Sequence, residues 1–221
     1  ITLIGGILVW LGWYGFNVGS AFTFDHIAMI SFVNTVIGAS AGAFGWLIFE
    51  YILKKTTSLL GLLSGALSGL VAITPAAGYV SYMSAMIIAI IGGICCYIVI
   101  NLIKVKLQYN DALDAFGIHG VGGILGAVLT GVFQSHQINS AVQNGFIYTA
   151  DFKVVVIQLG AAIATVVFSA IVTFLIARFI KIFTPLATTQ EEDKTGLDAI
   201  VHGEKAYFYG ELNKFNRHIK F

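Results

Sequence analysis

Charged residues are scarce in this sequence. Of its 221 residues, 10% are Asp, Glu, Lys or Arg, whereas 57% are hydrophobic. The mean hydropathy of +0.88 lies outside the range of soluble globular domains and predicts a polytopic membrane protein. The formal net charge of only +1 provides no basic surface, so we expect no nucleic-acid partner.

Cysteine and proline are also rare, with two of each. Cys95 and Cys96 are adjacent inside an apolar run, and adjacent cysteines rarely pair with each other, so they are interpreted as small apolar filler. The sequence has no metal-ligand spacing, no glycine-rich phosphate loop and no nucleophile–base arrangement. We therefore expect no metal, no cofactor and no enzymatic activity.

Glycine, by contrast, is frequent at 25 residues, which suits closely packed transmembrane helices. Only helices or closed barrels span a membrane, and the apolar runs here are too long and continuous for barrel strands. The expected fold is thus all-α, a polytopic membrane bundle of six transmembrane helices. They are expected at about 1–22, 27–53, 58–73, 83–103, 111–133 and 152–183, and the long last one should tilt or protrude.

Lysine and arginine orient these helices. Lys54, Lys55, Lys104 and Lys106 follow the second and fourth runs, Arg178 and Lys181 close the sixth, and the other loops contain neither residue type. The positive-inside rule then predicts a multi-pass cell-membrane protein with a cytoplasmic C-terminus. We expect a helix bundle over 1–184 and a cytoplasmic tail over 185–221. Because the chain begins at Ile1 inside an apolar segment without an initiator Met, it is interpreted as part of a longer protein.

A histidine lies inside the fifth run. Asn110 and Asp111 are expected to cap this helix, which places His119, eight residues after Asp111, roughly 12 Å along it. That is close to the middle of a roughly 30 Å apolar slab. An imidazole there is costly unless it faces a partner, a cavity or a pathway. Both a hydrogen-bonded histidine between helices and a pathway residue remain open, and the glycines around it leave room beside the ring.

Several motifs share one resemblance. Asp114-Ala-Phe-Gly-Ile-His-Gly-Val-Gly-Gly resembles the second histidine segment of the ammonium transporter (Amt/Rh) family. Four other stretches resemble further segments of the family, in order: Trp13-Tyr-Gly-Phe-Asn-Val-Gly-Ser20, Phe32-Val-Asn-Thr, the stretch from Ser58 to Ala76, and the tail motif from Gly196-Leu-Asp to His202-Gly-Glu-Lys-Ala-Tyr207. The family has eleven helices, an inverted pair of five-helix halves and one extra helix. The resemblance implies that this chain supplies helices six to eleven and the tail, and that the first half is missing.

The resemblance also implies site residues. His119 would be one of two histidines in a narrow apolar pore, where a neutral imidazole accepts a proton or binds ammonia, and its partner would belong to the missing half. Phe16 would form the aromatic gate, Trp13 the pore wall, and Ser20 a cation site beside aromatic rings. The alternatives are ordinary packing for the aromatics and a serine that bonds its own backbone. Ser64 and Thr74 match pore-side positions, but they are also explained as filler and as a helix cap.

Other matched residues are interpreted as structural or regulatory. Asp111 and Asp114 are expected to cap and position the histidine helix, and Gly196 to supply a turn. Asp198 and Glu204 are expected to face the lysines of the inner loops, and His202 and Tyr207 belong to the tail motif. Among partners, the resemblance implies membrane lipid, a homotrimer and a trimeric PII-type signalling protein at the tail.

Three functions follow for comparison. The leading one is transport of ammonium or ammonia. The second is a membrane sensor of the same fold that signals through its tail. The third is a structural fragment that cannot transport because half of the pore is absent.

Overall fold

The computed structural model describes residues 1–204, within which no β-strand occurs. Six helical segments are long and apolar enough to cross a membrane, which confirms the six predicted spans and the all-α fold. They are α1 (Thr2–Gly19), α2 (His26–Lys54), α3 (Leu59–Ile73) with a 3₁₀ turn (Thr74–Ala76), α4 (Tyr82–Ile98) continued by a π-helical turn (Val99–Ile103) and α5 (Lys104–Leu107), a π-helical turn (Phe116–Val121) followed by α6 (Gly122–Phe133), and α8 (Lys153–Ile180).

The described part of the chain divides into two compact units, the first of residues 1–166 and the second beginning at residue 167. The first contains α1 to α6, the short helix α7 (Phe146–Thr149) and the beginning of α8. The second holds the remainder of α8, α9 (Gln190–Thr195) and a π-helical turn (Asp198–His202). At 1.5 Å per residue, the 28 residues of α8 extend roughly 42 Å, longer than a roughly 30 Å apolar slab, as the length of the sixth run predicts.

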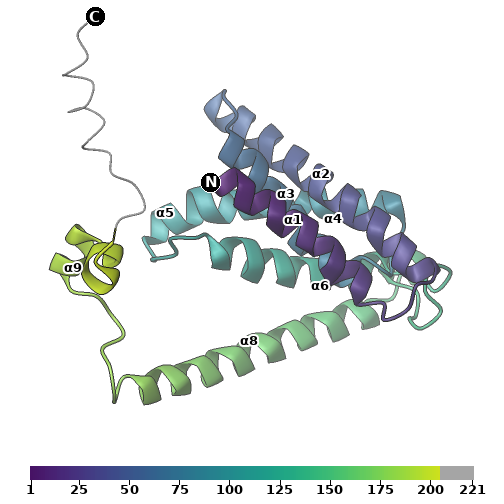
Figure 1. Ribbon diagram of the computed structural model, residues 1–221. Helices are drawn as coiled ribbons and strands as arrows, with labels where there is room; N and C mark the ends of the chain where they lie inside the picture. Colours follow the sequence, from purple (N-terminus) through teal and green to yellow (C-terminus); the bar gives the residue numbers. More distant parts are fainter. Residues whose placement is uncertain (205–221) are drawn as a thin grey trace, which may run out of the picture. The chain divides into compact units, whose positions relative to one another are not determined.

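The helices α2, α3 and α4 pack against one another in the first unit (Figure 1). Glycines lie at their contacts. A methyl group on Gly69 of α3 would collide with the backbone of Gly38 and Gly42 of α2. A methyl group on Gly93 of α4 would likewise meet the backbone at Gly42. Because these positions carry no side chain, three helix backbones approach closely, as small residues allow in membrane bundles.

Serine and aspartate side chains define where these three helices begin. Asp25 accepts hydrogen bonds from the N–H groups of Ile27 and Ala28 at the start of α2. Ser58 and Ser81 act in the same way at the starts of α3 and α4. Each oxygen satisfies an N–H group that has no partner within its helix.

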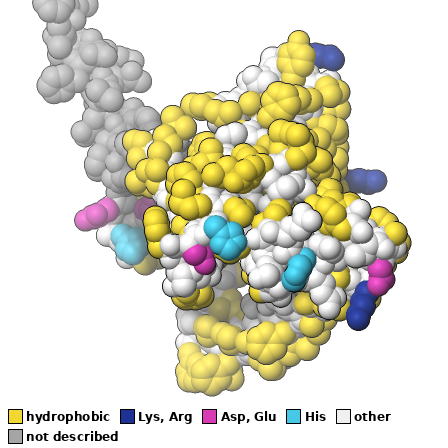
Figure 2. Space-filling view, turned by 90° about the vertical axis from the view of Figure 1, so that its right-hand side faces the viewer, with side chains coloured by type: hydrophobic (Ala, Val, Ile, Leu, Met, Phe, Trp, Pro, Cys, Tyr) yellow, Lys and Arg dark blue, Asp and Glu magenta, His cyan; other side chains and the backbone are white. Residues whose placement is uncertain are grey.

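A buried cluster joins α2, α3, α4 and the two π-helical turns of the first unit. It consists of Trp46, Val71, Cys96, Tyr97, Ile100 and Ile118, and Trp13 of α1 packs against it. The outer surface also carries many apolar side chains: hydrophobic groups are spread widely over the face in Figure 2, and charged ones are few. Such a surface suits hydrocarbon, as expected of a protein embedded in lipid.

The start of the histidine helix differs from the prediction. Helical structure begins at Phe116 rather than near Asp111, because Asp114 adopts a left-handed conformation (φ 55°) that ends the preceding turn. His119 is therefore only three residues into the helix, not eight. The predicted position of His119, roughly 12 Å along a helix beginning near Asp111, was therefore wrong. Its stacking on Trp13, the twelfth of the 18 residues of α1, now gives its position in the bundle.

Candidate functional site

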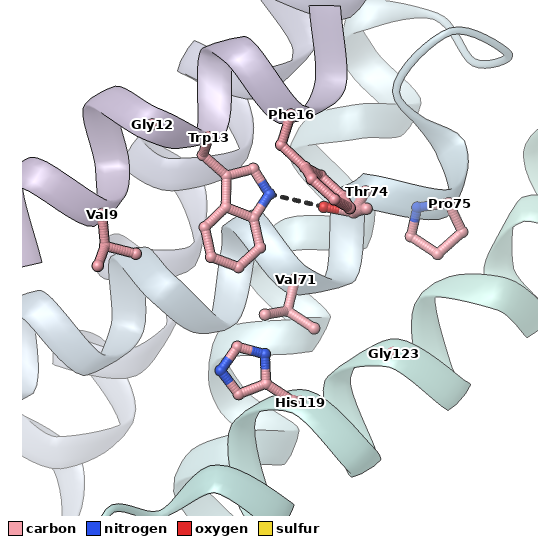
Figure 3. Close-up of a pocket in the computed structure, with 9 residues that line it drawn as sticks. All are labelled: Val9, Gly12, Trp13, Phe16, Val71, Thr74, Pro75, His119 and Gly123. Atoms are coloured by element: carbon pink, nitrogen blue, oxygen red, sulfur yellow. Dashed lines mark hydrogen bonds between the residues drawn. The ribbon is translucent and has the colours of Figure 1, made fainter. Parts of the chain in front are cut away.

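A cavity of about 370 Å³ lies in the first unit where α1, the end of α3 and the histidine helix converge (Figure 3). Its lining is apolar apart from few polar groups, which is the usual composition of a small-molecule site. The lining residues are Val9, Gly12, Trp13, Phe16, Val71, Thr74, Pro75, His119 and Gly123. Four of the residues expected from the sequence, on three separate segments, therefore meet at one cavity.

Aromatic rings face one another in this cavity. The Trp13 and His119 rings are stacked, with centroids 6.2 Å apart and planes 13° apart. Trp13 also meets Phe16 edge to face at 6.3 Å. Since aromatic faces carry negative partial charge, this arrangement offers a cation an attractive surface.

Thr74 fixes the tryptophan of this stack. Trp13 Nε1 donates a hydrogen bond of 2.8 Å to Thr74 Oγ1 (Figure 3), and Thr74 Oγ1 donates to the Leu70 carbonyl oxygen at 2.7 Å. The indole N–H and the threonine proton are thus both occupied. Because Thr74 lines the cavity as well as holding Trp13, it combines the cap-like bond to its own helix with a place in the site.

Glycines near His119 have two different surroundings. Methyl groups on Gly117 and Gly126 would collide with Ile100 and with the Ala72 backbone, so these glycines let the histidine helix approach α3 and α4. Gly123 lines the cavity, and nothing lies within 4 Å of where its side chain would be. The first two position the helix, whereas Gly123 leaves space beside the imidazole.

Two aspartates and a lysine stabilise the segment that precedes the histidine helix. The Asp111 carboxylate accepts hydrogen bonds from the N–H groups of Ala115 and Phe116 at 3.0 and 2.9 Å. Lys104 Nζ lies 2.7 Å from Asp114 Oδ1 and donates to the Asp111 carbonyl oxygen. The two aspartates thus hold the first turn of the His119 helix and tie it to Lys104 at the start of α5. No comparable bond is recorded for Asn110.

A second, more polar cavity of about 260 Å³ adjoins the first, and Phe16 and Thr74 line both. We call this second cavity, at the C-terminal end of α1, the outer cavity and the first one the inner cavity. Ser20 lines the outer cavity, and its hydroxyl donates to the Phe16 carbonyl oxygen at 2.6 Å. Its proton is therefore engaged by its own helix, and the serine offers the cavity an acceptor. Ser64, half-buried on α3, lines neither cavity.

Comparison with known proteins gives this arrangement a family. The family model described as Ammonium Transporter Family matches residues 1–207. The chain belongs to the ammonium transporter family. It is 50% identical to the "Ammonium transporter" of Bacillus subtilis over 93% of this chain and 51% of that protein, and 41% identical to the "Ammonium transporter" of Aquifex aeolicus over 94% and 48%.

Solved structures agree with this assignment. Saccharomyces cerevisiae Mep2 matches with a TM-score of 0.77 and 33% identity, over 82% of this chain and 42% of that one. A protein described as "Sensor Amt Protein" matches with a TM-score of 0.77 and 28% identity, over 90% and 48%. The chain therefore has the multi-pass helical fold of ammonium transporters and spans about half the length of the curated relatives that it matches.

The tail residues of this family member have local structure of their own. Thr189 and Glu192 form a reciprocal cap at the start of α9, and Gly196 follows that helix with φ +91°. Asp198 and His202 bound the next helical turn, and Glu204 is exposed. Tyr207 lies outside the described residues. The expected pairing of Asp198 and Glu204 with inner lysines stays a prediction; Lys104 and Lys54 have carboxylate partners within the first unit, Asp114 and Glu50.

Sequence reasoning missed the hydrophobic and amide residues of the two cavities. Val9, Val71 and Pro75 line the inner cavity and Asn17 lines the outer one. Asn17 stands inside the family-like segment between Phe16 and Ser20, so that segment was the available signal. In the part of the chain that the structure describes, no three His, Cys, Asp or Glu side chains are grouped to hold a metal ion.

Proposed function

We propose that this protein carries ammonium or ammonia across the cell membrane through a narrow apolar pore lined by histidine. The observation that carries the proposal is the stacked Trp13–His119 pair in an apolar cavity with Phe16 at its boundary. Curated relatives that share this sequence over half their length are named ammonium transporters. The pore is completed by the other half of the family fold, which contributes a second histidine.

The chemistry follows from loss of water. An ammonium ion reaching the outer cavity exchanges hydration for the Ser20 oxygen and aromatic faces, which attract a cation. Beyond Phe16 the lining is apolar, and desolvation favours the neutral form of the substrate. A neutral His119 imidazole accepts the proton or hydrogen-bonds ammonia.

The remaining predicted residues have supporting roles in this proposal. Trp13 and Thr74 hold the pore wall, and Ser64 is a pore-side residue that completes its surroundings with the other half of the fold. Asp111 and Asp114 position the histidine helix. The protein forms a homotrimer in the lipid bilayer, its C-terminus is cytoplasmic, and the tail from Gly196 to Tyr207 regulates the pore and can receive a PII-type protein.

A sensor of the same fold is the second candidate, supported by the match to the protein described as "Sensor Amt Protein". In that role the cavity binds ammonium and the tail transmits its occupancy. Ammonium-dependent signalling in the absence of measurable uptake by the complete protein would favour this candidate over transport.

Substitution of His119 tests the transport proposal. In the complete protein, His119→Ala is expected to abolish ammonium uptake or change its charge dependence, because no imidazole remains to accept the proton. Uptake of ammonium and the accompanying current in proteoliposomes measure both outcomes. His136→Ala, in an exposed loop histidine outside both cavities, is the matched control. Wild-type uptake by correctly folded His119→Ala protein would refute the role.

A further inference from the structure

Asn17 lies in an unusual position at the outer cavity. This cavity is lined by Phe16, Asn17, Ser20, Ala21, Asp25, Ile27, Ser31, Thr74, Ala77, Gly78, Tyr79 and Asn139. Most of its polar members are partly exposed, but Asn17 is only 6% exposed, so it reaches the cavity from within the helix packing. It directly follows Phe16, which lines both this cavity and the inner one.

Two hydrogen bonds fix which end of the Asn17 amide faces its neighbour helix. Asn17 Nδ2 donates to Thr35 Oγ1 of α2 at 3.0 Å. Thr35 Oγ1 in turn donates to the Ser31 carbonyl oxygen at 2.6 Å. A hydroxyl has one proton, so Thr35 can only accept from Asn17. The NH₂ group of Asn17 must therefore point to Thr35, and its carbonyl oxygen points away from it.

That carbonyl oxygen is left as an available acceptor. Among the described residues no hydrogen bond to Asn17 Oδ1 is recorded, and the atom is not sealed in protein as Asn34 Oδ1 is. Asn34 uses both of its amide protons on the carbonyl oxygens of Ala77 and Val80 and buries its oxygen completely. Asn17 differs because its oxygen is not among the fully buried side-chain atoms without a partner, and the residue lines the outer cavity.

Thr74, which lines both cavities, also has its proton bound to a protein oxygen. Its hydroxyl proton is bound to Leu70 and its oxygen already accepts from Trp13, so it has only acceptor capacity to offer. Ser20 also has its proton engaged. The side chains of Asn17, Thr74 and Ser20 thus each have a proton bound to a protein oxygen and offer oxygen acceptors.

We propose that Asn17 is a specificity-determining residue whose carbonyl oxygen accepts an N–H bond from ammonium immediately before Phe16, with Thr35 and Ser31 holding the amide in place. Ammonium has four N–H donors and no acceptor, so a neutral oxygen oriented in advance matches it and loses no energy in reorienting. Water needs a donor as well as an acceptor to be equally well bound. This inference rests on the proposed transport function.

Kinetics of uptake by the complete protein test the proposal. Asn17→Leu removes the acceptor, and we expect the KM for ammonium to rise about tenfold, the loss typical of one hydrogen bond to a charged donor. Thr35→Val keeps the Asn17 side chain but releases its orientation, and should raise KM in the same direction. Thr35→Ser restores the hydroxyl and should restore KM. Ser40→Ala is the control, since Ser40 is an exposed serine of α2 that bonds only its own helix and lines neither cavity.

The outcomes distinguish a failure of this inference from a failure of the proposed transport function. Thermal unfolding and size-exclusion profiles establish that each variant is folded. If folded Asn17→Leu and Thr35→Val transport with the KM of the wild type, the inference is overturned. A lower maximal rate at unchanged KM indicates a structural role only and also overturns it. Absence of uptake by the wild-type protein would instead refute the proposed function itself.

Discussion

At the scale of single residues, the chemistry of the two cavities depends on which protons are already used. The donors of Trp13, Thr74 and Ser20 are bound to protein oxygens. A substrate that donates N–H bonds meets acceptors there, whereas a substrate that needs donors meets none from these three side chains. Burial makes this difference larger, because an unmatched polar group away from water is costly.

Asp25 adds a negative charge to the outer cavity that persists in acid. Its pKa is below the ordinary value of 3.8, chiefly because the Ala28 N–H donates to the carboxylate, with further help from Thr23 and Ile27 and from the charge of His26. A lowered folded-state pKa means that the carboxylate stabilises the fold above its unfolded pKa and that this contribution is lost as pH falls through the folded value.

Comparison of the wild type with Asp25→Ala tests this dependence. The melting temperature in mild detergent should be lower for Asp25→Ala at pH 7, because α2 loses its N-terminal cap. The difference should stay constant down to about pH 4 and then shrink in more acidic buffer as the wild-type carboxylate is protonated. A difference that is unchanged at pH 3, or that widens there, would contradict the assignment of the charged cap.

Site residues could be predicted from the sequence only where they belong to a recognisable motif. Trp13, Phe16, Thr74 and His119 were expected as site residues and line one cavity. Asn17 was not expected, because its role depends on a hydroxyl 18 residues away whose own proton is committed elsewhere. Periodicity and composition carry no information about the direction of a hydrogen bond.

At the scale of elements, hydropathy predicted all six spans because each backbone in a membrane must satisfy its own hydrogen bonds as a helix. The beginning of the histidine helix was missed for a local reason. Asp111 does cap N–H groups, but those of Ala115 and Phe116, across a left-handed Asp114. The π-helical turns around Val99–Ile103 and Phe116–Val121 also have no signal in an apolar pattern.

Packing of α3 on α2 gives a prediction at this scale. Gly69→Ala should destabilise the complete protein by about 1–3 kcal/mol, since the added methyl meets backbone atoms of Gly38 and Gly42, which cannot rotate away. The melting temperature in detergent measures the effect. Gly160→Ala in α8 is the control, because nothing lies within 4 Å of its position. Equal melting temperatures for the two variants would show that α2 and α3 do not pack through Gly69.

At the scale of the whole molecule, the tail contains caps and turns that a solvated linker would not need. Thr189 and Glu192 cap α9 reciprocally, and two glycines, Gly196 and Gly203, adopt positive φ values of 91° and 67°. Glu204 N–H donates to the Asp198 carbonyl oxygen at 3.3 Å and closes the turn after the last helical residues. These features indicate a segment built to hold a defined shape, which favours the proposed regulatory role.

Deletion of the tail tests that role. Removal of residues 196–221 from the complete protein should leave the transmembrane helices folded but reduce transport or uncouple it from nitrogen status, since the motif that shapes the tail is lost. Removal of 208–221 alone, which keeps the motif through Tyr207, is the matched control and should preserve regulation. Ammonium uptake in nitrogen-rich and nitrogen-starved cells measures both. If the longer deletion leaves basal transport and its response to nitrogen unchanged, the tail does not regulate the pore; if the shorter one has the same effect as the longer, regulation depends on the residues after the motif.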